Sequence, residues 1–233
     1  GSNKEISNAI GLQALERRDE AVAVFRAALE IAPRSPEVLT NLGNALWSAR
    51  DFAAALDMHE RSLRLRPEHA ATYNNIGNAL LGMLRYDEAE AAFRHSLSLK
   101  SEPTTLCNLG NVQLAQNRTE AALDFYRQAQ VSDPGFKQAV FNEALVHLLR
   151  GDLRAGLPGY ELRWILRQRS FPRETPVEQW QGRESLEGKT ILVCCEQGFG
   201  DTLQFVRYVP LLQARGARVI LRAQKALLGL LSC

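Results

Sequence analysis

Asn41-Leu42-Gly43-Asn44-Ala45-Leu46 is the stretch that decides the fold, because the chain repeats it twice with few changes. The second copy is Asn-Ile-Gly-Asn-Ala-Leu at residues 75–80, and the third is Asn-Leu-Gly-Asn-Val at residues 108–112. The glycine therefore recurs at Gly43, Gly77 and Gly110 with an almost constant spacing. A sequence that repeats at this period predicts a solenoid, in which each unit buries its apolar face by stacking on the next.

Other residue types recur with the same spacing. An alanine follows each glycine by twelve residues, at Ala55, Ala89 and Ala122. Prolines close three of the repeats, at Pro33, Pro67 and Pro134, since proline lacks an amide donor and restricts the residue before it. The pattern resembles the tetratricopeptide repeat over residues 3–168, in about five repeats. The resemblance implies a mainly α fold, a right-handed helical solenoid of helix pairs that binds polypeptides.

The first and the last repeat depart from the pattern. Ala9 and Ala144 stand at the glycine place, and Gly156 stands where alanine is expected. Terminal repeats of a solenoid often differ from the others, because one of their faces meets solvent or another domain. We therefore assign both atypical repeats to the solenoid.

Asparagines recur on the predicted first helix of each repeat. One position holds Asn41, Asn75, Asn108 and Asn142, and the position three residues later holds Asn44, Asn78 and Asn111. Residues three apart share a helix face, so we expect these side chains to line a concave groove. A primary amide donates and accepts, which matches the backbone of an extended polypeptide. Bonds between neighbouring helices explain the same asparagines equally well. The row is similar to the asparagine-lined groove of O-linked N-acetylglucosamine transferases, which implies a polypeptide partner.

The pattern changes after residue 168. Residues 169–188 include Pro172 and Pro176 and are predicted to be a linker. The apolar run at residues 190–195 favours a buried parallel strand. A helix is expected at residues 202–214, with a possible kink at Pro210. A second strand is expected at residues 217–221 and a second helix at 225–231. This order predicts a short, truncated α/β (Rossmann-like) segment at residues 189–233.

A glycine turn, Glu196-Gln197-Gly198-Phe199-Gly200-Asp201, follows the first predicted strand. It is neither a P-loop nor a complete dinucleotide-binding pattern. Together with Trp180-Gln181-Gly182 it resembles the start of the heptosyltransferase-like glycosyltransferase domain of bacterial tetratricopeptide-repeat proteins. The resemblance implies that Asp201 is the general base, that Gly198 and Gly200 form a substrate loop, and that the full-length protein binds a nucleotide sugar. For this chain we favour a simpler role for Asp201 as the N-cap of the next helix, with Gln204 three residues later.

Composition limits the classes of function. The net charge is +2 and basic residues are interspersed with acidic ones, so no nucleic-acid partner is expected. No apolar run is long enough to span a membrane, and the four cysteines and four histidines show no metal-ligand spacing. We expect a cytoplasmic protein with no metal site and no cofactor in this chain.

Two parallel strands leave the edges of a sheet open. We therefore expect the chain to be a fragment of a longer protein, with self-association through the open α/β segment. Three functions fit the sequence. The leading one is a polypeptide-binding recognition arm of a glycosyltransferase, inactive by itself. The second is an active full-length glycosyltransferase that moves sugar from a nucleotide sugar to a protein or glycan hydroxyl, and the third is a non-catalytic scaffold.

Overall fold

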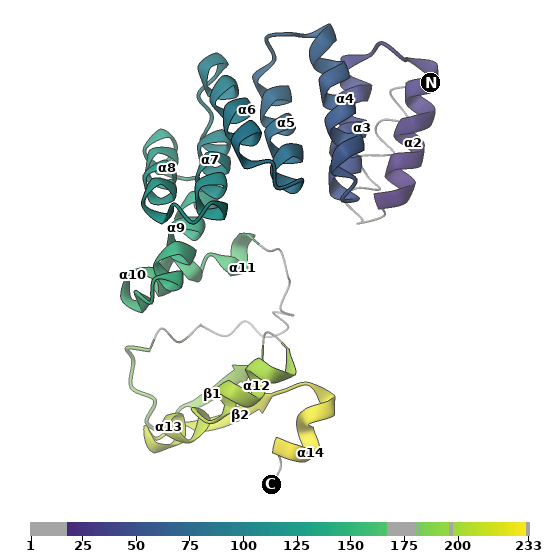
Figure 1. Cartoon of the computed structure of the whole chain (residues 1–233). Helices are drawn as coiled ribbons and strands as arrows, with labels where there is room; N and C mark the ends of the chain where they lie inside the picture. Colours follow the sequence, from purple (N-terminus) through teal and green to yellow (C-terminus); the bar gives the residue numbers. More distant parts are fainter. Residues whose placement is uncertain (1–17, 167–179, 181, 196–197, 232–233) are drawn as a thin grey trace. The chain divides into compact units, whose positions relative to one another are not determined.

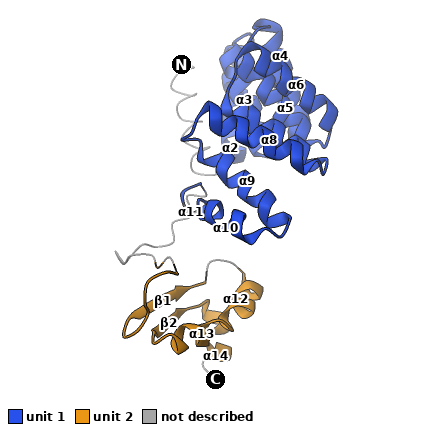
Figure 2. Ribbon diagram, turned by 90° about the vertical axis from the view of Figure 1, so that its left-hand side faces the viewer, with its two compact units in different colours: residues 1–168 blue, residues 169–233 orange. Residues whose placement is uncertain are grey.

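The chain divides into two units, residues 1–168 and 169–233, which are described separately (Figure 2). A computed structural model describes residues 18–166, 180, 182–195 and 198–231, without the side chain of Trp164. The first predicted helix of the solenoid and most of the predicted linker lie outside the described residues. None of the helices in the described ranges has the length and apolarity needed to cross a membrane.

The first unit is a row of stacked helix pairs (Figure 1). It begins with α2 (Arg18–Ile31), which takes the place of a second helix, and ends with the short α11 (Arg163–Leu166). Between them lie the pairs α3 (Pro36–Ser48) with α4 (Phe52–Leu65), α5 (Ala70–Gly82) with α6 (Tyr86–Leu99), α7 (Pro103–Ala115) with α8 (Thr119–Ser132), and α9 (Lys137–Leu149) with α10 (Leu153–Tyr160). The helices of a pair contact each other, and each of α2, α4, α6 and α8 also contacts the first helix of the next pair. The predicted tetratricopeptide-type solenoid is confirmed.

A glycine on the first helix faces a ring on the second helix in the three regular repeats. A Cβ atom would lie 2.5 Å from His59 if built on Gly43, 2.6 Å from Phe93 if built on Gly77, and 2.4 Å from Tyr126 if built on Gly110. Carbon atoms that are not bonded to each other normally stay about 3.5 Å or more apart. The recurring glycine is therefore a packing residue, which lets a ring lie against the backbone of the partner helix.

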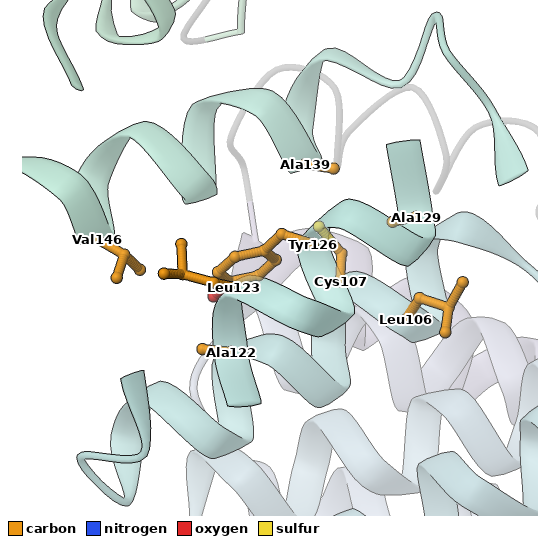
Figure 3. Close-up of a cluster of buried hydrophobic side chains, with 8 residues drawn as sticks. All are labelled: Leu106, Cys107, Ala122, Leu123, Tyr126, Ala129, Ala139 and Val146. Carbon is orange, nitrogen blue, oxygen red and sulfur yellow. The ribbon is translucent and has the colours of Figure 1, made fainter. Parts of the chain in front are cut away.

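The rings belong to the core of the stack. Phe25, Phe93 and Tyr126 are fully buried, and so is His59. Figure 3 shows Tyr126 close to Cys107 and Leu123, within a cluster that draws side chains from α7, α8 and α9. Because clusters of this kind join neighbouring pairs, the solenoid has an extended core that no single pair supplies.

The turn inside each pair holds one residue with a left-handed backbone. The φ angle is 66° at Arg50, 62° at Leu84, 61° at Asn117 and 80° at Gly151. The N–H of the next residue donates to a carbonyl five residues back, as from Arg85 to Leu80 at 3.0 Å. This bond closes a helix in the Schellman motif. Glycine and asparagine adopt a left-handed backbone readily, whereas a residue such as leucine adopts it at a cost.

The second unit contains two parallel strands. β1 (Thr190–Cys194) pairs with β2 (Arg218–Arg222), and Leu192 lies opposite Ile220. α12 (Phe199–Val206) and α13 (Val209–Ala214) connect the strands, and η1 (Lys225–Leu227) and α14 (Leu228–Leu231) follow β2. Leu192 and Ile220 are exposed, whereas Val193 and Leu221 on the other face are half-buried. The prediction of a buried strand is therefore wrong for one of the two faces.

The helices of the second unit also differ from prediction. The helix expected at residues 202–214 begins earlier, at Phe199, and breaks at Arg207 and Tyr208. Pro210 follows the break in the first turn of α13, where its missing N–H costs nothing. The last predicted helix begins as a 3-10 turn, η1. Within the predicted linker, the Gly188 N–H donates to the Gly216 carbonyl at 3.1 Å.

Candidate functional site

The seven predicted asparagines all lie on first helices of the pairs. They are Asn41 and Asn44 on α3, Asn75 and Asn78 on α5, Asn108 and Asn111 on α7, and Asn142 on α9, and together they are called the amide row below. Consecutive first helices contact each other along the stack (Figure 1). The structure therefore brings these predicted site residues onto neighbouring helices.

Two bonds within the amide row link successive repeats. The Asn75 amide Nδ2 donates to Asn44 Oδ1 at 3.0 Å, and Asn142 Nδ2 donates to Asn111 Oδ1 at 3.1 Å. Asn108 breaks this regularity, because its Nδ2 donates to Asn74 Oδ1 at 3.0 Å. The alternative explanation of the asparagines, as bonds between neighbouring helices, therefore accounts for part of the row.

Members of the row make the most internal hydrogen bonds where α7 meets α9. Asn111 Oδ1 accepts a second bond, from the Tyr126 hydroxyl at 2.8 Å. Asn142 is buried, lies 3.6 Å from Cys107 Sγ through its Nδ2, and accepts from Gln138 Nε2 at 2.7 Å. Burial raises the pKa of the Cys107 thiol to about 12 and raises the pKa of Tyr126. Both groups stay neutral, and Asn111 and Asn142 serve the packing of these helices.

The row keeps unused capacity on α3 and α5. Within the described part of the chain, the side-chain amides of Asn41 and Asn78 make no hydrogen bond, and Asn44 uses only its oxygen. We call these three residues the free amides. Trp47 lies beside them: it is 44% exposed, and its indole N–H donates to the Asn78 backbone carbonyl at 3.2 Å. A polar ligand can thus find donors and acceptors next to an aromatic surface.

A shallow hollow of about 570 Å³ lies elsewhere on the first unit. It is lined by Ser101, Leu106, Asp124, Arg127, Gln128, Val131 and Ser132. None of these residues belongs to the amide row, and Gln128 and Val131 come from the second helix α8. The hollow is therefore a separate surface from the predicted groove.

The glycine turn of the second unit differs from its predicted local structure. Gly198 is the N-cap of α12, and Asp201 lies inside the first turn of that helix. The N-cap role predicted for Asp201 is therefore wrong. Its carboxylate in the first turn still interacts favourably with the positive end of the helix dipole. Gly198 and Gly200 are exposed, and no atom would crowd a Cβ on Gly200. Glu196 and Gln197 of the turn lie outside the described residues.

The sequence pattern does not identify the residues that hydrogen-bond to some members of the amide row and leave others unbonded. Asn74 and Gln138 bond to its members, but their positions do not hold the same residue type in other repeats. We call the place on the second helix whose ring faces the recurring glycine the ring position. Tyr126 occupies it in its repeat, and the preceding repeats have Phe93 and His59 there. The available signal was the side chain at the ring position, since tyrosine brings a hydroxyl that phenylalanine lacks.

Comparisons with known proteins agree with the repeat architecture. A sequence model of the tetratricopeptide repeat matches residues 5–68, 36–102 and 68–130, and another matches residues 107–173. Protein FlbA of Caulobacter vibrioides is 27% identical over 203 residues, which are 87% of this chain and 29% of FlbA. Because the first unit ends at Gln168, a match of this length reaches into the second unit. The mouse protein O-mannosyl-transferase TMTC3 is 27% identical over 146 residues, 56% of this chain and 15% of TMTC3. The chain thus spans less than a third of either relative.

Solved structures with the same fold are more distant in sequence. TTC0263, a tetratricopeptide-repeat protein of Thermus thermophilus, is 18% identical with a TM-score of 0.66, over 73% of this chain and 93% of that one. PilW, a type IV pilus biogenesis factor, is 20% identical with a TM-score of 0.61, over 72% and 79%. PilF of Pseudomonas aeruginosa is 20% identical with a TM-score of 0.58, over 69% and 74%. At these identities the likeness concerns the fold alone.

Proposed function

This chain belongs to the tetratricopeptide-repeat family, and on that premise we propose that it is a polypeptide-binding module whose contact surface contains the free amides. The observation that carries the proposal is that, among the described residues, Asn41 and Asn78 make no side-chain hydrogen bond and Asn44 accepts only one, whereas Asn111 Oδ1 accepts two bonds and Asn142 uses both ends of its amide. Amides with unused donors and acceptors recur from one repeat to the next. A polypeptide backbone also presents donors and acceptors at a regular spacing, so it can bond to several of these amides at once.

The neighbourhood of the free amides supports a peptide more than a small molecule. The sites lie on separate helices instead of converging on one enclosed cavity, which a small ligand needs in order to bury most of its surface. Trp47 adds a large, half-exposed apolar side chain of the kind that dominates the energy of protein interfaces. An extended chain lying across α3 and α5 can reach Trp47 and the amides together.

The test is a selection of binding peptides followed by mutation of the free amides. A phage-displayed random peptide library is selected on the chain, and the affinities of synthetic copies are measured by fluorescence anisotropy. Changing Asn44→Ala together with Asn78→Ala should weaken binding about thirtyfold, since each of the two lost hydrogen bonds costs on the order of 1 kcal/mol. Gln128→Ala is the matched control, because it removes one amide in the hollow on α8. Equal affinities for the double variant and the parent, or a loss confined to Gln128→Ala, would contradict the proposal.

We further propose that in a longer protein this module is the recognition arm of a glycosyltransferase. Three observations support this idea: the exposed glycine turn with Asp201 at a helix start, the FlbA match that continues into the second unit, and the transferase name of TMTC3. The nucleotide sugar would bind outside this chain. In the full-length protein, Asp201→Asn should abolish sugar transfer from a labelled nucleotide sugar to a selected peptide, while peptide affinity stays unchanged. Absence of transfer from every common nucleotide sugar by the parent protein would favour the scaffold instead.

Self-association of the second unit is a separate proposal. The exposed pair Leu192 and Ile220 and the two-stranded sheet support it. Sedimentation velocity should then give a dimer for the parent and a monomer for Leu192→Lys. A monomer for both proteins would contradict it, and the cytoplasmic location stays a prediction.

A further inference from the structure

Charge is distributed unevenly between the helices of the solenoid. α5 and α7 contain no acidic, basic or histidine residue, and the only one on α3 is Glu37. Glu37 forms an ion pair with Arg66. The second helices differ sharply: α6 alone carries Asp87, Glu88, Glu90, Arg94 and His95. The surface that holds the free amides is thus polar but uncharged.

An uncharged polar surface discriminates against charged ligands. A charged side chain laid on α5 or α7 would lose part of its hydration and would find no ion partner on those two helices. Backbone groups and hydroxyl or amide side chains lose less, because asparagine can donate to them and accept from them. Specificity here comes from the penalty on the wrong ligand as much as from attraction to the right one.

The same helix face ends in leucines on the fifth repeat. Leu145 occupies the repeat position of Asn111, which holds asparagine in three repeats, and Leu149 occupies the repeat position of Ala115. These two leucines, called the leucine pair below, are 36% and 68% exposed. α9 contacts α7, and Asn142 of α9 bonds to Asn111 of α7. The uncharged face therefore continues from amides to exposed leucines.

Glu143 and His147 of α9 are turned away from this face, and Lys137 is exposed at the start of the helix. Glu143 accepts from Arg127 Nε at 3.0 Å and from Gln130 Nε2 at 2.6 Å, so it is turned to α8. His147 lies 3.8 Å from Glu143. Glu143 and His147 each lie two residues from Leu145. Residues two apart on a helix point in different directions, so these side chains do not lie on the helix face that carries Leu145. An apolar residue of a ligand can therefore reach the leucine pair without contacting Glu143 or His147.

We infer that the surface selects an extended polypeptide segment without charged side chains and holds an aliphatic residue of that segment at the leucine pair. The inference rests on the proposed function and names the partner class of the same site. The ligand is a segment rich in serine, threonine, asparagine or glycine with leucine-like residues near one end. Its neutral part lies along α3, α5 and α7, and its aliphatic end lies on α9.

Matched peptides test both halves of the inference. The parent probe is a Ser/Thr/Asn/Gly peptide of about 12 residues, which extends over roughly 40 Å. It is made in two versions, one with two leucines at the N-terminal end and one with two leucines at the C-terminal end. A second probe has serines in place of the leucines, and a third has two lysines or two glutamates in its neutral part. We expect the serine probe to bind about tenfold more weakly, and each charged probe to bind about tenfold or more weakly.

A variant of the chain locates the anchor. Leu145→Asn restores the residue type of the other repeats, and it should abolish the preference for leucine over serine while leaving the discrimination against charge. Val131→Asn changes an exposed apolar residue on α8 and should change neither preference. Thermal unfolding checks that both variants fold like the parent.

The possible outcomes separate this inference from the proposed function. Equal binding of neutral and charged probes that still depends on Asn44 and Asn78 overturns the inference and leaves the proposed function intact. No binding of any of these probes overturns the inference, and the proposed function is overturned with it only when the library selection also yields no binding peptide. Sedimentation of the chain alone that shows a dimer lost in Leu145→Asn also overturns the inference, because the leucine pair would then hold a second copy of the chain.

Discussion

A buried histidine ties the stability of the solenoid to pH. His59 occupies the ring position against Gly43, where the next repeats place Phe93 and Tyr126. Its side chain is 1% exposed, and its Nδ1 has no hydrogen-bond partner in the described part of the chain. Burial lowers the pKa of His59 to about 4, because the charged ring would lose its hydration in the core.

Acidification should destabilise the chain through this ring. Above about pH 6.5 the imidazole is neutral in both the folded and the unfolded chain, so it adds no pH dependence. Between pH 6.5 and 4 the unfolded chain binds a proton that the folded chain does not, and the free energy of unfolding falls by about 1.4 kcal/mol per pH unit. The loss reaches roughly 3 kcal/mol near pH 4 and grows no further below it.

Urea unfolding followed by circular dichroism at a series of pH values measures this loss. His59→Phe keeps a ring against Gly43 and removes the titrating group, so it should retain roughly 3 kcal/mol more stability than the parent near pH 4, relative to the difference at neutral pH. The exposed His95 serves as control, and His95→Gln should follow the parent. Carboxylates titrate alike in all three proteins and cancel in the comparison. Parallel loss of stability in His59→Phe and the parent would refute the reasoning.

Four further substitutions test the packing and the amide row by urea unfolding. Gly77→Ala should cost about 2 kcal/mol, because the new methyl group meets a buried ring; a stabilised variant would contradict this account. Leu84→Gly should gain about 1 kcal/mol by relieving the left-handed backbone, and a loss would show that no strain is held there. Asn111→Ala should cost about 1–3 kcal/mol, because the buried Tyr126 hydroxyl loses its acceptor, whereas Asn78→Ala should stay within about 0.5 kcal/mol. Equal losses of unfolding free energy in Asn111→Ala and Asn78→Ala would contradict the different roles assigned to these two asparagines.

The helix pairs could be predicted from the sequence because the same residue pattern occurs several times, so an uncertain assignment in one repeat is corrected by the others. A single Asn-Leu-Gly-Asn is weak evidence, but three copies at one spacing fix the period, the helix pairs and the close approach at Gly43, Gly77 and Gly110. The second unit offers one copy of each element. There a kink was expected at Pro210, but the exact place of the break, at Arg207 and Tyr208, and the early helix start at Phe199 were missed, since boundaries depend on capping and packing that a single pattern does not reveal.

The roles of individual asparagines could not be predicted in the same way. Repetition makes all members of the amide row look alike, whereas their roles depend on side chains that change from repeat to repeat. Asn111 and Asn78 occupy the same place, and each lies fifteen residues before a ring. The ring after Asn111 is Tyr126, whose hydroxyl reaches it, and the ring after Asn78 is Phe93, which has no hydroxyl.

The residue at the ring position therefore decides whether a hydroxyl bonds to the asparagine oxygen, and Phe93→Tyr tests that rule. The added hydroxyl should bond to Asn78 Oδ1 as Tyr126 bonds to Asn111, which would stabilise the chain by about 1 kcal/mol. Because Asn78 then loses part of its unused capacity, peptide affinity should fall although no residue of the contact surface has changed. Urea unfolding and anisotropy with one selected peptide measure the two effects. Higher stability with unchanged affinity would mean that Asn78 does not contact the ligand, and lower stability would mean that the ring position of this repeat has no room for the hydroxyl.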